Sequence, residues 1–373
     1  MKKVLGVFIN FVAIFFKLDN KKILFQSGRS KVDCSPYALY RYLKDNNITD
    51  FKCMWIVERD TDVSNLDKGD YCYYRTLKCF FELVTSKYWI RSQSLGGIIK
   101  KKKNQVYIQT WHGAGNFKKC ELDCLPEEKR TDETVGHSKD WDYLICTDEF
   151  NEKVMRSSLN FKKKSFIIGN MDSDLIVNAD SKYIDKVKEK LNLVDNKKKI
   201  IMYAPTFRDY DLDKKELNIP IMKLGKLDDY LILLKLHPLV SKKAENMQLP
   251  KNFINVGWYP NIVDLYLITD ILITDYSSII FPYMITNKSL IMYPYDYDDY
   301  VKLRGGFYLN YNEDLPGPIV YDEDKLYSAI KNIDNYRKEY KDRIIEFNNK
   351  YNNLNDGKVC EKFVKLLKDG KFK

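Results

Sequence analysis

The chain alternates short apolar runs with helical segments, and it does so in two successive series. The predicted strands of the first series are Lys22–Gln26, Cys53–Val57, Val106–Thr110, Tyr143–Thr147 and Phe166–Gly169, and those of the second are Ile200–Ala204, Leu231–Leu236, Phe253–Val256, Ile271–Thr274 and Leu290–Tyr293. These runs are apolar almost throughout, as parallel strands covered by helices on both faces require. Two such series predict two doubly wound α/β domains.

A lysine-rich segment, Ser181–Lys199, lies between the two series. Its apolar residues Ile184, Val187 and Leu191 are spaced for one face of a helix. We expect an N-terminal domain over residues 1–190, a second domain over 191–345, and a C-terminal helical segment over 346–373. Two apolar stripes favour helices in this last part of the chain: Leu326, Ile330 and Ile333, then Val359, Phe363 and Leu366.

Composition narrows the class of protein. Apolar residues make up 45% of the 373 residues, so the chain is globular. The formal charge of +10 fits nucleic acid, anionic lipid or a phosphate-rich substrate as a partner. The eight cysteines form no C-x-x-C pair and only three histidines occur, which argues against a structural zinc site. Scattered cysteines without a cleavable signal are typical of a cytoplasmic protein.

The N-terminal run Val4–Phe16 is thirteen residues long, nearly all apolar, and flanked by lysines on both sides. It is too short to span a bilayer. Two interpretations stay open. The run is either a helix or strand of the core, or an interfacial anchor with its phenylalanines in the lipid boundary and its lysines on anionic headgroups. Lys100–Lys103 would add a second basic contact with a membrane.

A histidine follows one of the predicted strands of the first series. The segment Gln109–Gly115 places His112 at the carboxyl end of that strand, where open α/β sheets bind ligands. Gly113 beside it allows a backbone to approach a substrate closely. His112 is therefore a candidate general base, although a histidine at a strand end often has a purely structural role.

The second series offers two further strand ends. In Tyr203–Asp209, the hydroxyl of Thr206 and the guanidinium of Arg208 suit a phosphate or diphosphate, while pairing of Arg208 with Asp209 or another acid is an equal alternative. His237 ends another strand, and Pro238 after it terminates that strand. Two histidines in matching places, one in each series, favour the hypothesis that they face each other across an interdomain cleft.

The segment Thr274–Ser278 joins a strand to a predicted helix. Thr274 and Asp275 end the strand, and Ser277 or Ser278 would cap the helix and leave hydroxyl and N–H groups for an anion. A capped helix without a ligand is the alternative. No nucleotide-binding glycine pattern occurs, and no cluster of histidines with carboxylates predicts a metal, so we expect neither a cofactor nor a metal.

Taken together, these segments resemble the CDP-glycerol:poly(glycerophosphate) glycerophosphotransferase family of teichoic acid synthesis. The matching motifs run in order from about residue 21 to 320: Trp111-His112-Gly113 with Lys118-Lys119, Tyr203–Asp209, His237-Pro238, Thr274–Ser278, Arg304–Tyr308 and Leu315–Val320. There are departures. Ala114-Gly115 stands where the family often has Thr-Pro, and Gly169–Asp174 keeps only the ends of a G-x-P-R-N-D pattern. The Ala-Gly variant is similar to ribitol-phosphate transferases, which leaves the polyol open.

The resemblance implies an α/β fold of the GT-B-like class: two Rossmann-like domains with a cleft between them, the donor held by the second domain and a C-terminal helix crossing back to the first. It also implies a transferase that moves glycerol phosphate from CDP-glycerol, or ribitol phosphate from CDP-ribitol, to a hydroxyl of a teichoic-acid-like or capsular polymer and releases CMP. The implied acceptor is polymeric or lipid-linked, on an anionic membrane surface at the cytoplasmic face. No nucleic-acid partner is implied.

The same resemblance assigns roles to the candidate residues. His112 and His237 are the expected catalytic residues, with His112 as the base on the attacking hydroxyl. The donor-binding set is Gly113, Thr206, Arg208, Thr274, Asp275, Ser277 and Ser278. Two rival functions remain at this point: a GT-B glycosyltransferase that uses a nucleotide sugar, and a non-catalytic protein that binds membranes or polyanions through its positive charge.

Overall fold

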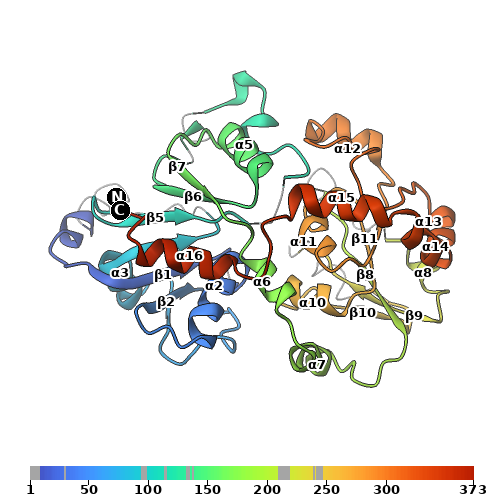
Figure 1. The fold of residues 1–373 in the computed structure, drawn as a ribbon, viewed down its shortest axis with the longest axis horizontal. Coiled ribbons are helices and arrows are strands. Elements are labelled where there is room, and N and C mark those ends of the chain that lie inside the picture. The colour runs from blue at the N-terminus through green and yellow to red at the C-terminus, as the bar shows by residue number, and fades with distance from the viewer. Residues whose placement is uncertain are drawn as a thin grey trace. The chain divides into compact units, whose positions relative to one another are not determined.

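The structure is a computed structural model that describes residues 9–28, 31–93, 99–112, 116–131, 135–136, 138–208, 219–237, 240 and 247–373. The chain divides into two compact units, each built on one parallel sheet (Figure 1). The first unit comprises Met1–Gly113, Glu121–Leu175 and Leu354–Lys373, and the second comprises Ala114–Cys120 and Ile176–Asn353. The predicted α/β class with parallel sheets is confirmed.

The sheet of the first unit has the order β3-β2-β1-β4-β5-β6-β7, and every pairing in it is parallel. Its strands are β1 (Asp19–Gln26), β2 (Lys52–Val57), β3 (Tyr71–Tyr73), β4 (Ser86–Arg91), β5 (Val106–Gln109), β6 (Tyr143–Cys146) and β7 (Lys164–Ile167). Strands β3 and β4 are absent from the predicted set. Strand β4 carries polar residues at both ends and follows a helix without a turn, so no sequence signal marks its start.

Helices cover both faces of this sheet. They are α2 (Cys34–Asp45), α3 (Leu77–Thr85), α5 (Glu149–Ser158), α6 (Asp172–Val177) and α16 (Val359–Lys368), with short 3-10 turns at Glu121–Asp123 and Glu127–Lys129. One core cluster combines the strands with α2 and α16, and another combines them with residues of α3 and α5. In α16 Val359, Phe363 and Leu367 are buried, and the predicted stripe residue Leu366 is partly buried and packs against the same core cluster.

The N-terminal run is partly described, because residues 4–8 lie outside the described residues. Residues 9–13 are helical, and Ala13 is buried. The ring of Phe16 packs edge-on against Phe80 and Phe81, with centroids 5.7 and 5.9 Å apart. Phe11 and Phe15 are 58% and 73% exposed. The segment therefore packs on the first unit with one side and presents aromatic rings to solvent with the other.

The sheet of the second unit has the order β10-β9-β8-β11-β12, again parallel throughout. Its strands are β8 (Lys199–Tyr203), β9 (Tyr230–Leu234), β10 (Phe253–Asn255), β11 (Ile271–Thr274) and β12 (Ser289–Met292). Each overlaps a predicted strand. The helices are α7 (Ser181–Lys190), α8 (Ile221–Leu224), α10 (Ile262–Ile268), α11 (Ile280–Met284), α12 (Tyr297–Arg304), α13 (Glu323–Lys331), α14 (Ile333–Glu339) and α15 (Lys341–Tyr351).

Candidate active site

The strand order of the second unit reverses beside β8, because β9 and β10 lie on one side of it and β11 and β12 on the other. Ligands of open α/β sheets bind at the carboxyl ends of strands at such a switch point. The segments that leave β8 and β11 here are residues 204–208 and 275–279. Five predicted donor-binding residues thus reach one edge of the sheet: Thr206, Arg208, Asp275, Ser277 and Ser278.

Arg208 is buried and paired within the second unit. Its Nη2 lies 2.8 Å from Oδ2 of Asp275, and its Nε donates to Oδ2 of Asp296 over 2.7 Å. Burial alone would lower the pKa of Arg208, but the two carboxylates overcome this effect and raise it. Arg208 therefore forms an ion pair, with Asp275 and Asp296 as its partners. Contact of Arg208 with a diphosphate stays a prediction.

Tyrosine rings surround this ion pair. The Arg208 guanidinium lies 4.9 Å from the ring of Tyr276 and 5.2 Å from that of Tyr300, and the two rings stack at 3.7 Å. The hydroxyl of Tyr276 donates to Oδ1 of Asp296 over 2.9 Å. Sequence reasoning missed Tyr276 and Asp296. The signal for Asp296 was its place four residues beyond the end of β12, at the same edge of the sheet.

Two predicted residues fix the backbone of this edge. Thr274 is fully buried, and its Oγ1 donates to the carbonyl of Ala204 over 2.7 Å. Oδ1 of Asp275 accepts hydrogen bonds from the backbone N–H groups of Thr206 and Tyr276. The carboxylate of Asp275 therefore ties the exit of β8 to the exit of β11, in addition to its ion pair with Arg208.

Three hydroxyl groups remain at this edge. Oγ1 of Thr206 is shielded from solvent and has no hydrogen-bond partner within the described part of the chain. Ser277 and Ser278 are half-buried. The predicted serine cap is wrong, because α11 begins at Ile280 with Ile279 at its N-cap and no side-chain cap there. Oγ of Ser277 instead accepts from the N–H of Ile279 at 3.4 Å, in a local side-chain turn.

His237 follows β9 and is exposed, whereas Pro238 lies outside the described residues. Its imidazole stacks on the ring of Phe207, with centroids 5.1 Å apart and an interplanar angle of 20°. Nζ of Lys235 donates to the carbonyl of Tyr259 over 2.6 Å and so fixes the chain just before His237. Phe207 was missed as a functional candidate, although it lies inside the Tyr203–Asp209 motif.

In the first unit, His112 follows β5 through a strained turn. The backbone of Trp111 has a φ of 59°, which is unusual for a bulky residue, and its N–H donates to Oε1 of Gln109 over 2.9 Å. Nδ1 of His112 lies 3.3 Å from the carbonyl oxygen of Ser92. Because a carbonyl only accepts, this contact fits the tautomer with the proton on Nδ1, which has the lone pair needed by a general base on Nε2. Gly113 lies outside the described residues.

A shielded carboxylate lies in the same unit outside the predicted set. Asp172 is part of the Gly169–Asp174 segment, and its Oδ1 is shielded from solvent without a hydrogen-bond partner among the described residues. Burial and, to a smaller extent, the neighbouring carboxylate of Asp33 raise the pKa of Asp172 to about 7, although the nearby hydroxyl of Ser35 acts to lower it. The departure from the family motif at this segment was the only sequence signal.

The part of the chain that the structure describes contains no group of three or more His, Cys, Asp or Glu residues arranged to hold a metal ion. None of the helices described has the length and apolar character needed to cross a bilayer.

Comparisons with known proteins agree with the motifs. The family model of the CDP-Glycerol:Poly(glycerophosphate) glycerophosphotransferases matches residues 8–369. The teichoic acid poly(glycerol phosphate) polymerase of Bacillus spizizenii is 30% identical over 368 residues, which are 94% of this chain and 92% of that protein. The corresponding polymerase of Staphylococcus epidermidis is 32% identical over 94% of this chain, but the chain spans only 51% of its length.

Solved structures show the same likeness. The wall teichoic acid polymerase TagF, in a histidine variant soaked with CDPG, superimposes with a TM-score of 0.84 at 29% identity, covering 99% of this chain and 93% of that one. By sequence, a teichoic acid poly(ribitol-phosphate) polymerase of Bacillus spizizenii matches only 71% of the chain, at 30% identity. The superposition on TagF confirms the predicted GT-B-like class. With a family model that covers nearly all residues and with the motifs in place, the chain belongs to the CDP-glycerol:poly(glycerophosphate) glycerophosphotransferase family.

Proposed function

We propose that this protein transfers glycerol phosphate from CDP-glycerol to a hydroxyl of a teichoic-acid-like polymer. The acceptor oxygen attacks the β-phosphorus, the bond between that phosphorus and the CMP oxygen breaks, and CMP leaves with the electron pair. Membership of the family supports this chemistry. Glycerol is favoured over ribitol, because the glycerol-phosphate polymerases match 94% of the chain and the ribitol-phosphate polymerase 71%.

The observation that carries the proposal is the geometry of His112. Its Nδ1 is held against the carbonyl of Ser92, so Nε2 is the nitrogen that takes the proton of the attacking hydroxyl. The strained backbone at Trp111 places the imidazole beyond the strand end. Phosphoryl transfer needs mainly positioning and charge stabilisation, so one positioned base is chemically sufficient on this side of the reaction.

The second unit supplies the proposed donor site. Thr206, Ser277 and Ser278 offer hydroxyls to the diphosphate, and the shielded, unpartnered Oγ1 of Thr206 supports a ligand at this edge. His237 stabilises the leaving CMP from the end of β9. Arg208, with Asp275 and Thr274 around it, is proposed to position these loops and to add positive charge near the diphosphate. Gly113 completes the set without a described geometry.

We further propose that the reaction takes place at the cytoplasmic face of the membrane. The acceptor is then lipid-linked or polymeric, and the protein is a peripheral one. The exposed rings of Phe11 and Phe15 and the neighbouring lysines support this location.

The test is a transfer assay that measures CMP release with CDP-glycerol, CDP-ribitol and UDP-sugars as separate donors. We expect turnover with CDP-glycerol and a loss of about 10²- to 10⁴-fold in kcat for His112→Ala, with donor affinity unchanged. His137→Ala is the matched control, since His137 is the one histidine of the sequence outside the motifs. Near wild-type turnover of His112→Ala would remove it from the mechanism, and preference for CDP-ribitol would correct the polyol.

A further inference from the structure

Arg91 is the last residue of β4, and it is buried without a counter-ion. Only 7% of the residue is exposed. Its Nε is shielded from solvent and has no hydrogen-bond partner, and no carboxylate of the described residues pairs with its guanidinium. A charge is costly to bury unless a partner neutralises it. The first unit therefore holds a cation whose counter-ion the described part of the chain does not supply.

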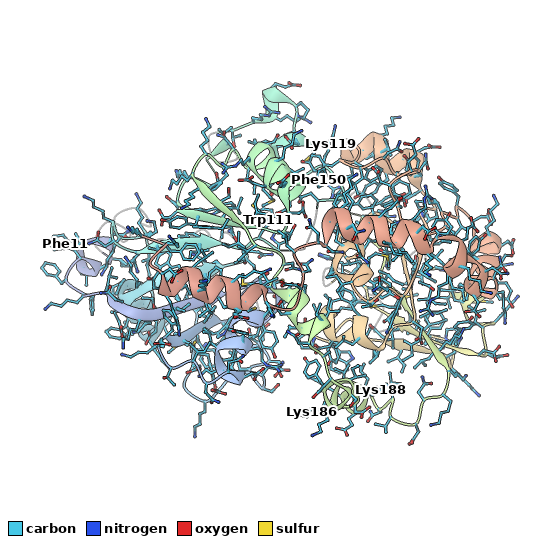
Figure 2. All side chains as sticks on the ribbon, in the orientation of Figure 1. Phe11, Trp111, Lys119, Phe150, Lys186 and Lys188 are labelled. Atoms are coloured by element: carbon cyan, nitrogen blue, oxygen red, sulfur yellow. The ribbon has the colours of Figure 1, made fainter. Side chains whose placement is uncertain are left out.

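The groups around this guanidinium are rings and N–H donors. It lies 5.8 Å from the ring of Trp89 and 5.3 Å from that of Tyr107, and such rings attract a cation but carry no net charge. Gln109 is the register partner of Arg91 at the end of β5, and it is fully buried. Its Oε1 accepts from the N–H of Trp111, which Figure 2 labels, whereas its Nε2 has no acceptor among the described residues. Two neighbouring strands thus end in donors that lack an acceptor.

Acidic residues of the surrounding elements have other partners. On α3, Glu82 accepts a hydrogen bond from Nζ of Lys22 over 2.8 Å. Asp142, just before β6, pairs with Lys101 at 2.9 Å. Each of these carboxylates is already neutralised, so neither serves as the counter-ion of Arg91.

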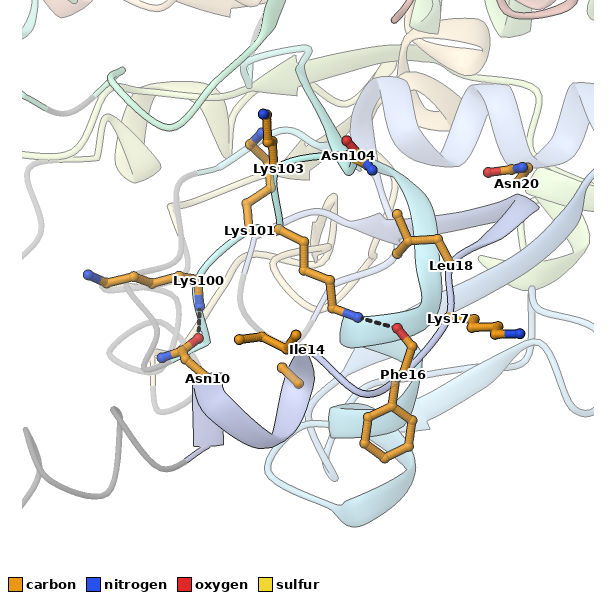
Figure 3. A pocket seen from close by; sticks show the side chains of 12 residues that line it. Asn10, Ile14, Phe16, Lys17, Leu18, Asn20, Lys100, Lys101, Lys103 and Asn104 are labelled. Carbon is orange, nitrogen blue, oxygen red and sulfur yellow. Dashed lines mark hydrogen bonds between the residues drawn. The ribbon is translucent and has the colours of Figure 1, made fainter.

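The lysines of the first unit that gather in one place differ from Arg91. Lys17 and Lys100–Lys103 line a pocket between the N-terminal helical turn and the loop before β5 (Figure 3). Lys103 is exposed, so water solvates its charge. Nζ of Lys102 donates to the carbonyl of Phe16 over 2.7 Å. Burial without a partner therefore sets Arg91 apart from these cations and points to a ligand.

Arg91 is connected to the candidate base His112 in two ways. Ser92 follows Arg91 directly, and its carbonyl oxygen lies 3.3 Å from Nδ1 of His112. Three aromatic rings also lead in succession from the guanidinium toward the imidazole. They are Tyr107, Trp141 and Trp111, with centroids 6.5 and 6.0 Å apart, and the last lies 4.5 Å from the imidazole. A ligand of Arg91 is thus bound on the same edge of the sheet as a hydroxyl at His112.

We propose that Arg91 binds the last phosphodiester of the acceptor polymer, next to the glycerol unit whose hydroxyl His112 deprotonates. A guanidinium suits this group, because its planar fork matches two phosphate oxygens. Nη1 and Nη2 of Arg91 have no partner among the described residues and are not shielded as Nε is, so a phosphate reaches them. Nε2 of Gln109 offers a further donor. The inference rests on the acceptor proposed above but not on cleavage of CDP-glycerol.

The test measures binding of a soluble glycerol phosphate oligomer to the whole protein by calorimetry, in the absence of any donor. We expect Arg91→Gln to weaken binding about 10- to 100-fold, since charge-assisted hydrogen bonds are lost. Arg41→Gln is the matched control, because Arg41 also lies over a ring, 6.0 Å from that of Tyr37, but pairs with Asp45. It should bind within about twofold of wild type. Equal losses in both variants would show that only net charge attracts the oligomer.

Gln109→Glu tests the missing counter-ion directly. The new carboxylate lies beside Arg91 and still accepts the N–H of Trp111. We expect this variant to unfold at a higher temperature than wild type and to lose the oligomer, because Arg91 is then neutralised from within. The oligomer should raise the unfolding temperature of wild type but not that of Gln109→Glu or Arg91→Gln. A lower unfolding temperature in both variants, with oligomer binding retained, would give Arg91 a purely structural role.

Kinetics separate binding from positioning of the base. The two acceptors are the oligomer and an analogue with a methylphosphonate in place of its last phosphodiester, which keeps the tetrahedral shape and removes the charge. Wild type should prefer the oligomer, and Arg91→Gln should lose most of this preference through a higher KM. A loss confined to kcat would mean that Arg91 acts only through Ser92 on His112. If no protein releases CMP from CDP-glycerol, the proposed reaction fails, while calorimetry still decides about the phosphate site.

Inorganic phosphate distinguishes the two sources of the anion. It should compete with the oligomer for wild-type protein and bind more weakly, since it lacks the adjoining glycerol. Binding of inorganic phosphate that depends on Arg91, together with oligomer binding that does not, would assign the site to a free anion and overturn the polymer assignment.

Discussion

The guanidinium of Arg208 bonds to carboxylates from two different loops of the second unit, and both partners are largely buried. Breaking a buried ion pair by removing one partner leaves uncompensated charge and costs about 3–5 kcal/mol. We expect Arg208→Gln to lower the free energy of unfolding by this amount and to weaken CMP binding along with it. Urea unfolding and calorimetry with CMP provide the two measurements.

Arg41→Gln is the control for this prediction, since Arg41 pairs with Asp45 one helical turn away on the surface of α2. Exposed pairs of this kind contribute about 0–1 kcal/mol. If Arg208→Gln unfolds like wild type but fails to bind CMP, the guanidinium serves the ligand and not the fold.

Asp172 makes a pH-dependent contribution to stability. Its pKa is about 7 in the folded protein, against 3.8 for the ordinary side chain, so the folded state holds the proton more tightly. The contribution of Asp172 to stability therefore falls as the pH rises from about 4 to about 7, and Asp172→Asn should remove this contribution. At pH 8 we expect the variant to be more stable than wild type by roughly 2–4 kcal/mol. Thermal unfolding at pH 5 and pH 8 measures the difference.

The neighbouring Asp174 offers the contrast. Its carboxylate accepts hydrogen bonds from the N–H groups of Val359 and Cys360 over 3.0 and 2.7 Å. Asp174→Asn should therefore destabilise the protein at pH 8, where Asp172→Asn stabilises it. Burial raises the pKa of Asp174 as well, so a gain in both variants would mean that burial of its charge outweighs its two backbone hydrogen bonds.

Sequence reasoning located the polar residues of the second unit but not their partners. The rule that ligands meet the carboxyl ends of parallel strands brought Thr206, Arg208 and Asp275 together correctly. It left the partner of Arg208 open, because Asp296 lies 88 positions further along the chain. A guanidinium beside a strand end looks the same in sequence whether it binds a phosphate or a carboxylate.

Among the elements, α16 packs closely at its start against a single glycine, Gly169. Gly169 has a φ of +104°, and a Cβ at this position would lie 2.8 Å from a methyl group of Val359 and 2.9 Å from the carbonyl of Leu354. Gly169→Ala should therefore destabilise the protein through backbone strain and through displacement of the α16 entry. We expect the cost to exceed that of the control by about 1–3 kcal/mol, measured by urea unfolding.

The control is Gly69→Ala. Gly69 has nearly the same φ, +101°, but a Cβ there meets nothing within 4 Å. The backbone strain is thus matched, and the difference between the variants reports the packing against α16 alone. Equal losses of stability in the two variants would show that α16 shifts to make room for the Cβ without an energetic cost.

Helix α16 also shows what an apolar pattern in the sequence cannot predict. The apolar stripe of α16 predicted an amphipathic helix, and the helix is present. The stripe says that one face is buried but not which sheet covers it. The sequence pattern missed strand β4 for a different reason. This strand lies at the centre of its sheet, between β1 and β5, but three of the six residues in its sequence SKYWIR are polar.

For the whole molecule, the alternation of strands and helices was enough to predict two α/β domains, because parallel strands need long crossover connections, which are usually helices. This alternation does not show that both units are discontinuous; only the family resemblance implied that the C-terminal helix returns to the first domain. Residues 114–120 belong to the second unit, where the N–H of Tyr308 donates to the carbonyl of Phe117 and the ring of Phe117 stacks on that of Phe307. Contacts between residues so far apart follow from packing, which local periodicity does not encode.

The return of residues 354–373 to the first unit has a consequence for biosynthesis. A ribosome releases the chain from its N-terminus, and domains usually fold in that order. Here the core beside β1 and α2 includes Val359, Phe363 and Leu367, which emerge only after all of residues 176–353. The first unit thus begins to appear earliest and is completed after the second. Until then its nascent chain exposes an apolar sheet face, for which a chaperone would be the natural temporary cover.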